Sequence, residues 1–381
     1  MQLLKIVFLY IVSLLLGAGL LSGCGGTDQN DDEILSITVP EGATSGDLKE
    51  IAREVMFTPL KMPDSVFIST FNVKVYGDLL FNMDRGGQMI TVFDVNTGDF
   101  IAQLNESGDA PGKYQRMYTF AFNPAEQKIY VMSQIEGMYV YDYPSMQFVE
   151  KFEDPNYMES MEVLPGNRLF TVSDDYDEQE QMIGFRYWDT KFEKSETTGF
   201  ENSTFSILAS TENAYYRQSD GNLLFVYPQT VSRVYKFDGN TSEQLATIDF
   251  GNKGLPEDIW NQSEDELEQL MDMISREKPR YHIHDYVETE SRIYFWFFEG
   301  LYDQEPDRLA VYSKEYQSVE VYDNISSDLL YLDLPRPHYS LDDSYVNLVY
   351  YGDIKAADVS QLYSGEEPEE EDILLMRYYL H

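Results

Sequence analysis

The sequence predicts an all-β fold, a six-bladed β-propeller with a short helical insertion, from two observations. The first is a repeat: six short runs of β-branched and aromatic residues each follow a small group of turn-forming residues. These units recur at a period of roughly 40 to 70 residues, which is typical of propeller blades. The second is composition, because 43% hydrophobic and 14% aromatic residues can supply a core for several small sheets.

The strands of the repeat follow one another in a regular order. The first runs are residues 79–81, 129–131, 169–172, 223–226, 293–296 and 346–349. The second runs, found in the first five units, are residues 90–94, 138–142, 185–189, 234–238 and 309–313. Four of these five end in Asp, whose carboxylate accepts backbone hydrogen bonds of the next turn. A third run follows in the early units, as at 100–104 and 147–152.

The sixth unit and the closure of the ring need separate treatment. This unit lacks a second strand until residues 373–379, beyond an acidic stretch at 365–372 that we expect to be a loop. A ring of blades must also be closed, because its ends would otherwise leave strand edges unpaired. Residues 34–39 and 55–60 are the candidates for an N-terminal closing strand. A two-sheet sandwich is the competing architecture, since alternating strands are compatible with both.

One segment departs from the β pattern. Residues 263–266 fit a capping box, and four apolar residues then share one helical face: Leu267, Leu270, Met271 and Ile274. We therefore expect a helical insertion at about residues 257–277, between the fourth and fifth blades. A second short helix is expected around residues 45–53.

The N-terminus has the pattern of a bacterial lipoprotein signal. Lys5 precedes an apolar run at residues 6–16, and Leu-Ser-Gly-Cys at 21–24 fits a lipobox that is cleaved before a lipid-bearing cysteine. A retained transmembrane helix is the alternative. It is disfavoured because Gly17 and Gly19 interrupt the run before it reaches the roughly 20 apolar residues of a span.

These features predict the domain organisation and the location. We expect a signal peptide at residues 1–23, an acidic flexible tether at 24–33 and a single propeller domain at 34–381. Cys24, the only cysteine, is the predicted lipidation site, which leaves no thiol for a disulfide or a cysteine nucleophile. The acidic tether favours an outer-membrane lipoprotein of the bacterial cell envelope, periplasmic or surface-exposed.

The net charge of −40 restricts the partners. Binding to nucleic acid needs clustered basic residues, and none are clustered here, so we expect no nucleic-acid partner. Attraction to anionic lipid heads is disfavoured for the same reason, which leaves the lipid anchor as the contact with the membrane.

A family resemblance rests on a few short motifs. Asp47-Leu48 leads to Phe-Thr-Pro-Leu at residues 57–60, and residues 108–114 form a Gly-x-x-Pro-Gly loop ending in Tyr114, with a looser echo at 251–256. In these motifs the chain resembles the six-bladed β-propeller family of bacterial lipoproteins, distant relatives of NHL-repeat propellers. The resemblance implies the fold and leaves the activity open.

Few residues suggest catalysis or metal binding. His282 and His284 alternate along a probable strand beside Asp285, but with two other histidines in the chain we predict no transition-metal site. The carboxylates of residues 174–178 form an expected acidic loop without EF-hand spacing, so no cofactor is expected and calcium is the one candidate ion. The chain has no Gly-x-Ser-x-Gly motif and no P-loop, and we assign no catalytic residue.

The excess of aromatic residues is more suggestive of binding. The chain has 30 Tyr, 22 Phe and 3 Trp, and aromatic side chains at a propeller mouth can stack on sugars or anchor proteins. Most will pack inside the sheets, but Trp260, in the helical insertion, is the first candidate for an exposed ligand contact. We therefore predict a membrane-anchored extracytoplasmic binding module for a protein or glycan partner. The alternative is an NHL-like lyase or lactonase-type hydrolase with a divalent cation bound in its channel.

Overall fold

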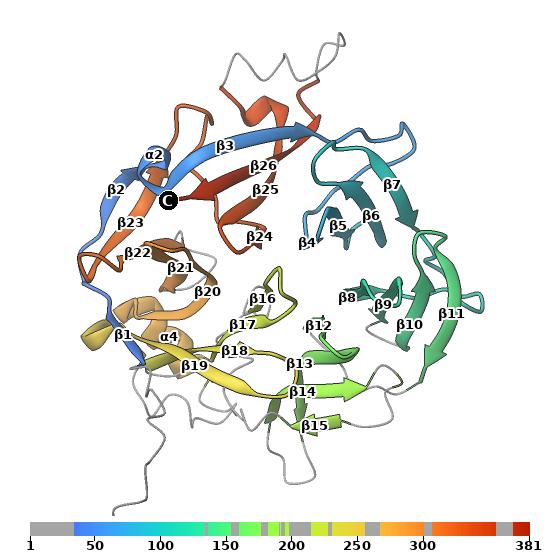
Figure 1. The fold of residues 1–381 in the computed structure, drawn as a ribbon, viewed down its shortest axis with the longest axis horizontal. Helices are drawn as coiled ribbons and strands as arrows, with labels where there is room; N and C mark the ends of the chain where they lie inside the picture. The colour runs from blue at the N-terminus through green and yellow to red at the C-terminus, as the bar shows by residue number, and fades with distance from the viewer. Residues whose placement is uncertain are drawn as a thin grey trace, which may run out of the picture. The chain divides into compact units, whose positions relative to one another are not determined.

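Six β-sheets surround a common axis in the computed structural model (Figure 1). The structure describes residues 34–133, 136–153, 160–176, 182–189, 191, 195–197, 215–227, 231–255, 267–300, 307–355 and 369–381. Residues 36–381 form one compact unit, and this unit is the propeller. The predicted six-bladed architecture is therefore confirmed, and the two-sheet sandwich is excluded.

Each blade consists of four antiparallel strands, with its first strand nearest the axis (Figure 1). Blade one contains β4 (Val73–Tyr76), β5 (Leu79–Asp84), β6 (Met89–Asp94) and β7 (Phe100–Leu104). Blade two contains β8 (Met117–Asn123), β9 (Lys128–Ser133), β10 (Gly137–Asp142) and β11 (Gln147–Phe152). Blade three contains β12 (Ser160–Leu164), β13 (Arg168–Tyr176), β14 (Met182–Asp189) and β15 (Ser195–Thr197). Blade four contains β16 (Tyr215–Arg217), β17 (Leu223–Tyr227), β18 (Val231–Phe237) and β19 (Ser242–Asp249). Blade five contains β20 (Arg280–Glu288), β21 (Arg292–Glu299), β22 (Arg308–Ser313) and β23 (Ser318–Ser326). Blade six contains β24 (Tyr339–Ser340), β25 (Ser344–Tyr350), β26 (Ile373–Leu380) and β3 (Ala52–Pro59).

The runs predicted from the sequence are mainly the middle strands of these blades. The six first runs lie in β5, β9, β13, β17, β21 and β25, and the second runs lie in β6, β10, β14, β18 and β22. Of the innermost strands, only β20 was anticipated, through its histidines. Strands β4 and β12 were missed because each contains a charged residue, Lys74 or Glu162, and β16 and β24 were missed because they are short. Strand β8 was missed although its seven residues are uncharged.

The ring is closed by the N-terminal strand β3, which pairs antiparallel with β26 from Leu374↔Pro59 to Leu380↔Ala52. This confirms residues 55–60 as the closing strand. The other candidate becomes β1 (Leu35–Thr38), which lies on the outer edge of β19 in blade four. Between them, β2 (Thr44–Asp47) pairs in parallel with β23 of blade five. Consecutive N-terminal strands thus join the outer edges of blades four, five and six.

The helical elements are short. In α2 (Leu48–Ile51), the Asp47 side chain accepts a hydrogen bond from Lys49 N, and the Glu50 side chain accepts one from Asp47 N, which forms a capping box. This helix is shorter than expected because residues 44–47 form a strand. The insertion between blades four and five contains α4 (Leu267–Glu277), whose Ile274 is buried. Its predicted start and capping box lie outside the described residues. Single 3₁₀ turns are η1 (Gly251–Lys253) and η4 (Tyr351–Asp353). No described helix is both long and apolar enough to cross a membrane.

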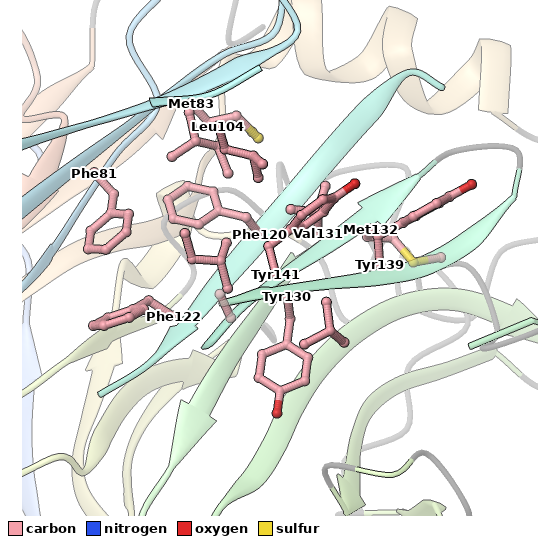
Figure 2. Packing of buried hydrophobic residues seen from close by; sticks show 14 of the residues in the cluster. Phe81, Met83, Leu104, Phe120, Phe122, Tyr130, Val131, Met132, Tyr139 and Tyr141 are labelled. Carbon is pink, nitrogen blue, oxygen red and sulfur yellow. The ribbon is translucent and has the colours of Figure 1, made fainter. Parts of the chain in front are cut away.

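The core lies between neighbouring blades (Figure 2). Phe81 of blade one and Phe122 of blade two have ring centroids 4.8 Å apart, and Tyr76 packs edge-on against both at 5.5 Å. Each blade is too thin to bury its own apolar face, so it buries that face against the next blade. Most tyrosines and phenylalanines of the blades serve this packing, which accounts for much of the aromatic excess.

Candidate functional site

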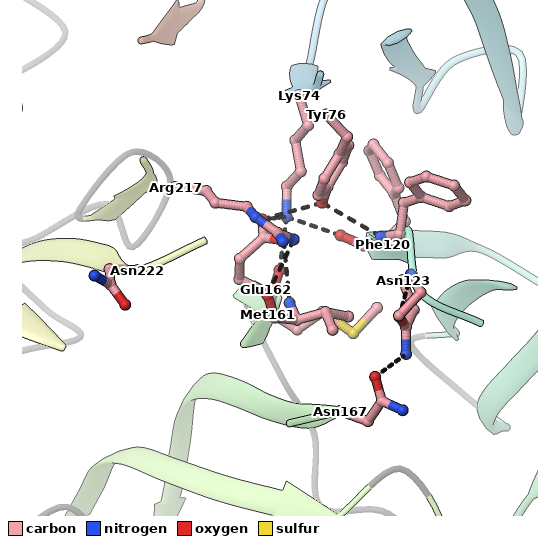
Figure 3. Close-up of polar contacts among 12 residues, drawn as sticks. Lys74, Tyr76, Phe120, Asn123, Met161, Glu162, Asn167, Arg217 and Asn222 are labelled. Carbon is pink, nitrogen blue, oxygen red and sulfur yellow. Dashed lines mark hydrogen bonds and ion pairs between the residues drawn. The ribbon is translucent and has the colours of Figure 1, made fainter. Parts of the chain in front are cut away.

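A buried ion network lies on the axis of the propeller (Figure 3). At its centre is the carboxylate of Glu162, whose side chain is 1% exposed. Glu162 accepts a hydrogen bond of 3.0 Å from the Tyr76 hydroxyl. Its oxygens also lie 3.6 Å from Lys74 Nζ and 3.8 Å from Arg217 Nη1. The network therefore holds two cationic groups and one anionic group in a position with little water.

Lys74 has further partners. Its ammonium donates to the Phe120 carbonyl at 2.8 Å and to the Met161 carbonyl at 2.6 Å. Burial lowers the pKa of Lys74, and the charge of Glu162 opposes this shift. Carbonyls and a carboxylate thus compensate the desolvated ammonium, as a buried charge requires.

The network connects strands that are distant in the sequence. Lys74 and Tyr76 come from β4, the Phe120 carbonyl from β8, Glu162 from β12 and Arg217 from β16. Loss of one partner in a buried ion pair costs about 3–5 kcal/mol, because the remaining charge is left without compensation. The four inner strands are therefore held in one arrangement.

An open pocket of about 440 Å³ lies where four inner strands end. Its lining comes from residues at or just after the ends of β4, β8, β16 and β24, together with Arg377 of β26. We call this pocket the axial mouth, defined by Tyr76, Arg217, Ser219, Asp342, Asp343 and Arg377. Because Tyr76 and Arg217 belong to both, the ion network forms the inner wall of the axial mouth.

The charged groups of the axial mouth are fixed by local contacts. Asp342 accepts a hydrogen bond from Ser219 N at 3.1 Å, which links the inner hairpins of blades four and six. Asp343 pairs with Arg53 Nη2 at 2.9 Å. The Arg217 guanidinium lies over the Tyr76 ring, 5.6 Å from its centroid. The axial mouth thus presents arginines, carboxylates and an aromatic ring, most of them at or just after strand ends.

A second polar group, the histidine cluster, lies near the starts of β20 and β24. It is defined by His282, His284, Asp285, His338 and Ser340, and it gathers three of the four histidines of the chain. His284 Nδ1 lies 2.8 Å from Asp285 Oδ2, and Ser340 Oγ donates to Asp285 Oδ1 at 2.8 Å. The rings of His282 and His284 have centroids 5.5 Å apart. The two imidazoles are therefore neighbours on a strand that is distorted rather than regular.

The distortion of β20 is a local backbone feature. His282 has φ 48° and Asp285 has φ 53°, in the left-handed region that L-residues seldom adopt. The pairing of β20 with β21 shifts register at both positions, which indicates two bulges. Bulges and strained residues occur preferentially near functional sites, and here they turn His282 and Asp285 out of the regular alternation.

Burial controls the protonation of the histidine cluster. It lowers the pKa of His282 and of His284 well below the ordinary value, and it lowers that of His338 to about 4. Burial also raises the pKa of Asp285 and of Asp307 to about 6, against the opposing charge of Arg336. The histidines are therefore neutral at pH 7.

The geometry of the histidine cluster argues against two kinds of chemistry. Ser340 donates to Asp285 and not to an imidazole, so no histidine is placed to activate its hydroxyl. Within the described ranges, no three His, Cys, Asp or Glu side chains are grouped to hold a metal ion. A divalent cation in the channel thus finds no support among these residues.

The predictions for individual residues have different outcomes. Cys24 and Trp260 lie outside the described residues, so their roles stay predictions. Residues 174–176, expected in an acidic loop, belong to strand β13, and 177–178 lie outside the description. The expectation of a loop was wrong for those three residues because the strand pairing with β14 continues past a bulge to Tyr176.

The residues of the ion network and of the axial mouth were not predicted from the sequence. The available signal was a charged residue inside a short apolar run, such as Glu162 within Ser-Met-Glu-Val-Leu. An ionisable residue within such a strand has to find a partner, and a network on the axis supplies one. The identity of its partners could not be read from the sequence.

The fold and the axial mouth together define a six-bladed propeller with a polar opening on its axis. The chain belongs to the family described as "Domain of unknown function (DUF4934)", whose profile matches residues 36–374. It is similar in fold to a protein of Bacteroides fragilis that is inferred to be exported, with a TM-score of 0.67, 16% identity, and coverage of 91% of this chain and 99% of that one. A DUF4221 family member from Bacteroides vulgatus gives a TM-score of 0.47 at 10% identity, covering 87% of this chain and 98% of the other. No curated protein matches the chain.

The buried histidines predict a pH dependence of stability. Because the folded pKa of His282 lies below its ordinary value of 6.5, the unfolded chain binds more protons as the pH falls below 6.5. The two aspartates act in the opposite direction, since their raised pKa values favour the native state as the pH falls through about 6. We isolate one histidine with His282→Asn, because Asn tolerates the positive φ. Between pH 6.5 and 5, the free energy of unfolding of the wild type should fall relative to this variant by up to about 1.4 kcal/mol per pH unit.

The measurement is urea denaturation of the full chain at several pH values. The control is His381→Asn at the C-terminus, outside the histidine cluster, which should keep the wild-type slope. Parallel curves for the wild type and His282→Asn would contradict the assignment of a buried neutral imidazole.

Proposed function

We propose that this protein is a lipid-anchored binding protein of the bacterial cell envelope that captures a protein or glycan partner at the axial mouth. The observation that carries the proposal is the axial mouth itself, an open pocket of about 440 Å³ with arginines, carboxylates and an aromatic ring on its wall. Sites of this size, with a few fixed polar groups among apolar ones, are typical of ligand binding.

Rigidity supports binding at this position. Arg217 is held by the Val163 carbonyl at 3.1 Å and by the Tyr76 ring beneath its guanidinium. Ser219 is held through its backbone by Asp342. Groups that are already ordered lose little conformational entropy when a ligand arrives, which favours affinity. Trp260 remains a further proposed ligand contact, and calcium a proposed ion.

The proposed location rests on the N-terminal sequence. The lipobox ending at Cys24 supports lipidation, and more than one acyl chain would give stable anchoring. The acidic tether supports placement in the outer membrane, with the propeller in the periplasm or on the surface. The similarity to an exported protein of the same fold agrees with this location. Kinship with NHL-repeat propellers is part of the same proposal and rests on the short motifs of the sequence.

A blocking substitution tests the axial mouth. Ser219 is exposed, and only its backbone N–H takes part in the bond to Asp342. Ser219→Trp should therefore fill the pocket without disturbing the fold. We expect glycan arrays and cross-linking in envelope extracts to identify a partner of the wild type whose binding falls at least tenfold in this variant.

The matched control is Ser318→Trp, an equally exposed position at the start of the outer strand β23. It should bind as the wild type does. If the partner binds Ser219→Trp undiminished, or if neither screen finds a partner, the proposal fails.

The anchor has its own test. Intact-mass spectrometry of the protein extracted from membranes should show a chain that begins at Cys24 and carries acyl groups. A chain that retains residues 1–23, or an unmodified Cys24, would contradict the lipoprotein assignment.

A further inference from the structure

We infer that the ligand of the axial mouth is an acidic sugar whose carboxylate is held between Arg217 and Arg377. This inference rests on the proposed function and narrows it to a class of ligand. It follows from the hydrogen-bond donors and acceptors that the axial mouth leaves available, from its charge and from its dimensions.

Arg217 has unused hydrogen-bonding capacity. A guanidinium has five N–H donors, and Nη1 of Arg217 donates to the Val163 carbonyl at 3.1 Å. Its contact with Glu162, at 3.8 Å, is longer than a hydrogen bond. Among the described residues, its Nε and Nη2 atoms have no hydrogen-bond partner, although the side chain is only 18% exposed.

The guanidinium of Arg377 also has hydrogen-bond donors that are not used. Its Nε donates to Ser344 Oγ at 2.9 Å, and its guanidinium is stacked over the Tyr379 ring with the centroid at 4.5 Å. The distance from Nη2 to Asp343 Oδ1 is 3.8 Å, which again exceeds a hydrogen bond. The packing orients Arg377 but leaves donors of its guanidinium available to a ligand.

The acceptors of the axial mouth are partly occupied. Asp343 already receives the Arg53 guanidinium at 2.9 Å, and both oxygens of Asp342 lie close to Ser219 N. A carboxylate has about four lone-pair sites, so each aspartate can still accept from a hydroxyl. The site thus needs an anionic acceptor for its arginines and can accept hydrogen bonds from neutral hydroxyls.

The net charge of the side chains around the axis favours an anionic ligand. Across the ion network and the axial mouth, the side chains of Lys74, Arg217, Arg53 and Arg377 carry four positive charges against the three carboxylates of Glu162, Asp342 and Asp343. This local excess occurs in a chain whose net charge is −40. A carboxylate at the axial mouth would compensate the excess, and carboxylates pair with guanidinium groups through strong, directional hydrogen bonds.

The remaining lining favours a sugar over a peptide end. A uronic acid joins one carboxylate to several hydroxyls on an apolar ring face, and the pocket adds the apolar side chains of Val75, Pro124 and Leu341 to its polar groups. A volume of about 440 Å³ suits a ligand of one or two rings. A peptide with a free C-terminal carboxylate is the competing ligand, and the experiment includes it.

The test is calorimetric titration of the purified full chain. The probes are disaccharides of galacturonic acid and of glucuronic acid, each compared with its neutral counterpart, and a short peptide with a free C-terminal carboxylate. We expect at least one acidic disaccharide to bind tenfold or more tightly than its neutral counterpart. Arg377→Gln should reduce that affinity at least tenfold and leave the neutral counterpart unchanged, because the substitution removes the charge at the edge of the site.

The control variant is Arg233→Gln, which removes an exposed arginine on β18 away from the axial mouth and should bind as the wild type does. Equal binding of acidic and neutral sugars, lost in Ser219→Trp, would overturn the acidic-sugar inference and leave the proposed function standing. Binding of a short peptide through its terminal carboxylate, without sugar binding, would replace the sugar by a protein partner. Failure of every probe overturns this inference alone, because the proposed function is decided by the Ser219→Trp screen.

Discussion

The structure depends on one buried carboxylate. Glu162 lies on the axis, with the Tyr76 hydroxyl, Lys74 and Arg217 around it, and these groups hold β4, β8, β12 and β16 together. Apolar packing between blades contributes to stability and to a single well-ordered native state. The buried charge adds a directional constraint, because another arrangement of the inner strands would leave an ion without its partners.

Two structural features hold the six blades together, the ion network and the N-terminal strands. The ion network joins blades one to four at the axis, and the consecutive N-terminal strands β1, β2 and β3 join blades four to six at the rim. Blade four takes part in both, so the two features together connect the whole ring. The rigidity of the axial mouth follows, since Arg217 at the end of β16 and Arg377 within β26 lie on strands that are fixed from inside or outside.

The sequence predicted the parts of the fold that depend on local patterns. Apolar runs such as 79–81, Asp-ended strands and the closing strand at 55–60 have local signatures of burial and turns. Two of the inner strands lack such a signature, because β16 has three residues and β12 contains Glu162. The axial mouth was beyond prediction because its residues meet only in space, as Tyr76 and Glu162 do across 86 positions. His282 was placed on a strand correctly, but its positive φ depends on tertiary context.

The most direct test of this account is native-state hydrogen exchange of Glu162→Gln compared with the wild type. If the carboxylate holds the four inner strands together, protection should fall in β4, β8, β12 and β16 as one group, while β20 and β24 keep their protection. A loss confined to β12, or spread evenly over all six blades, would contradict the central role of Glu162.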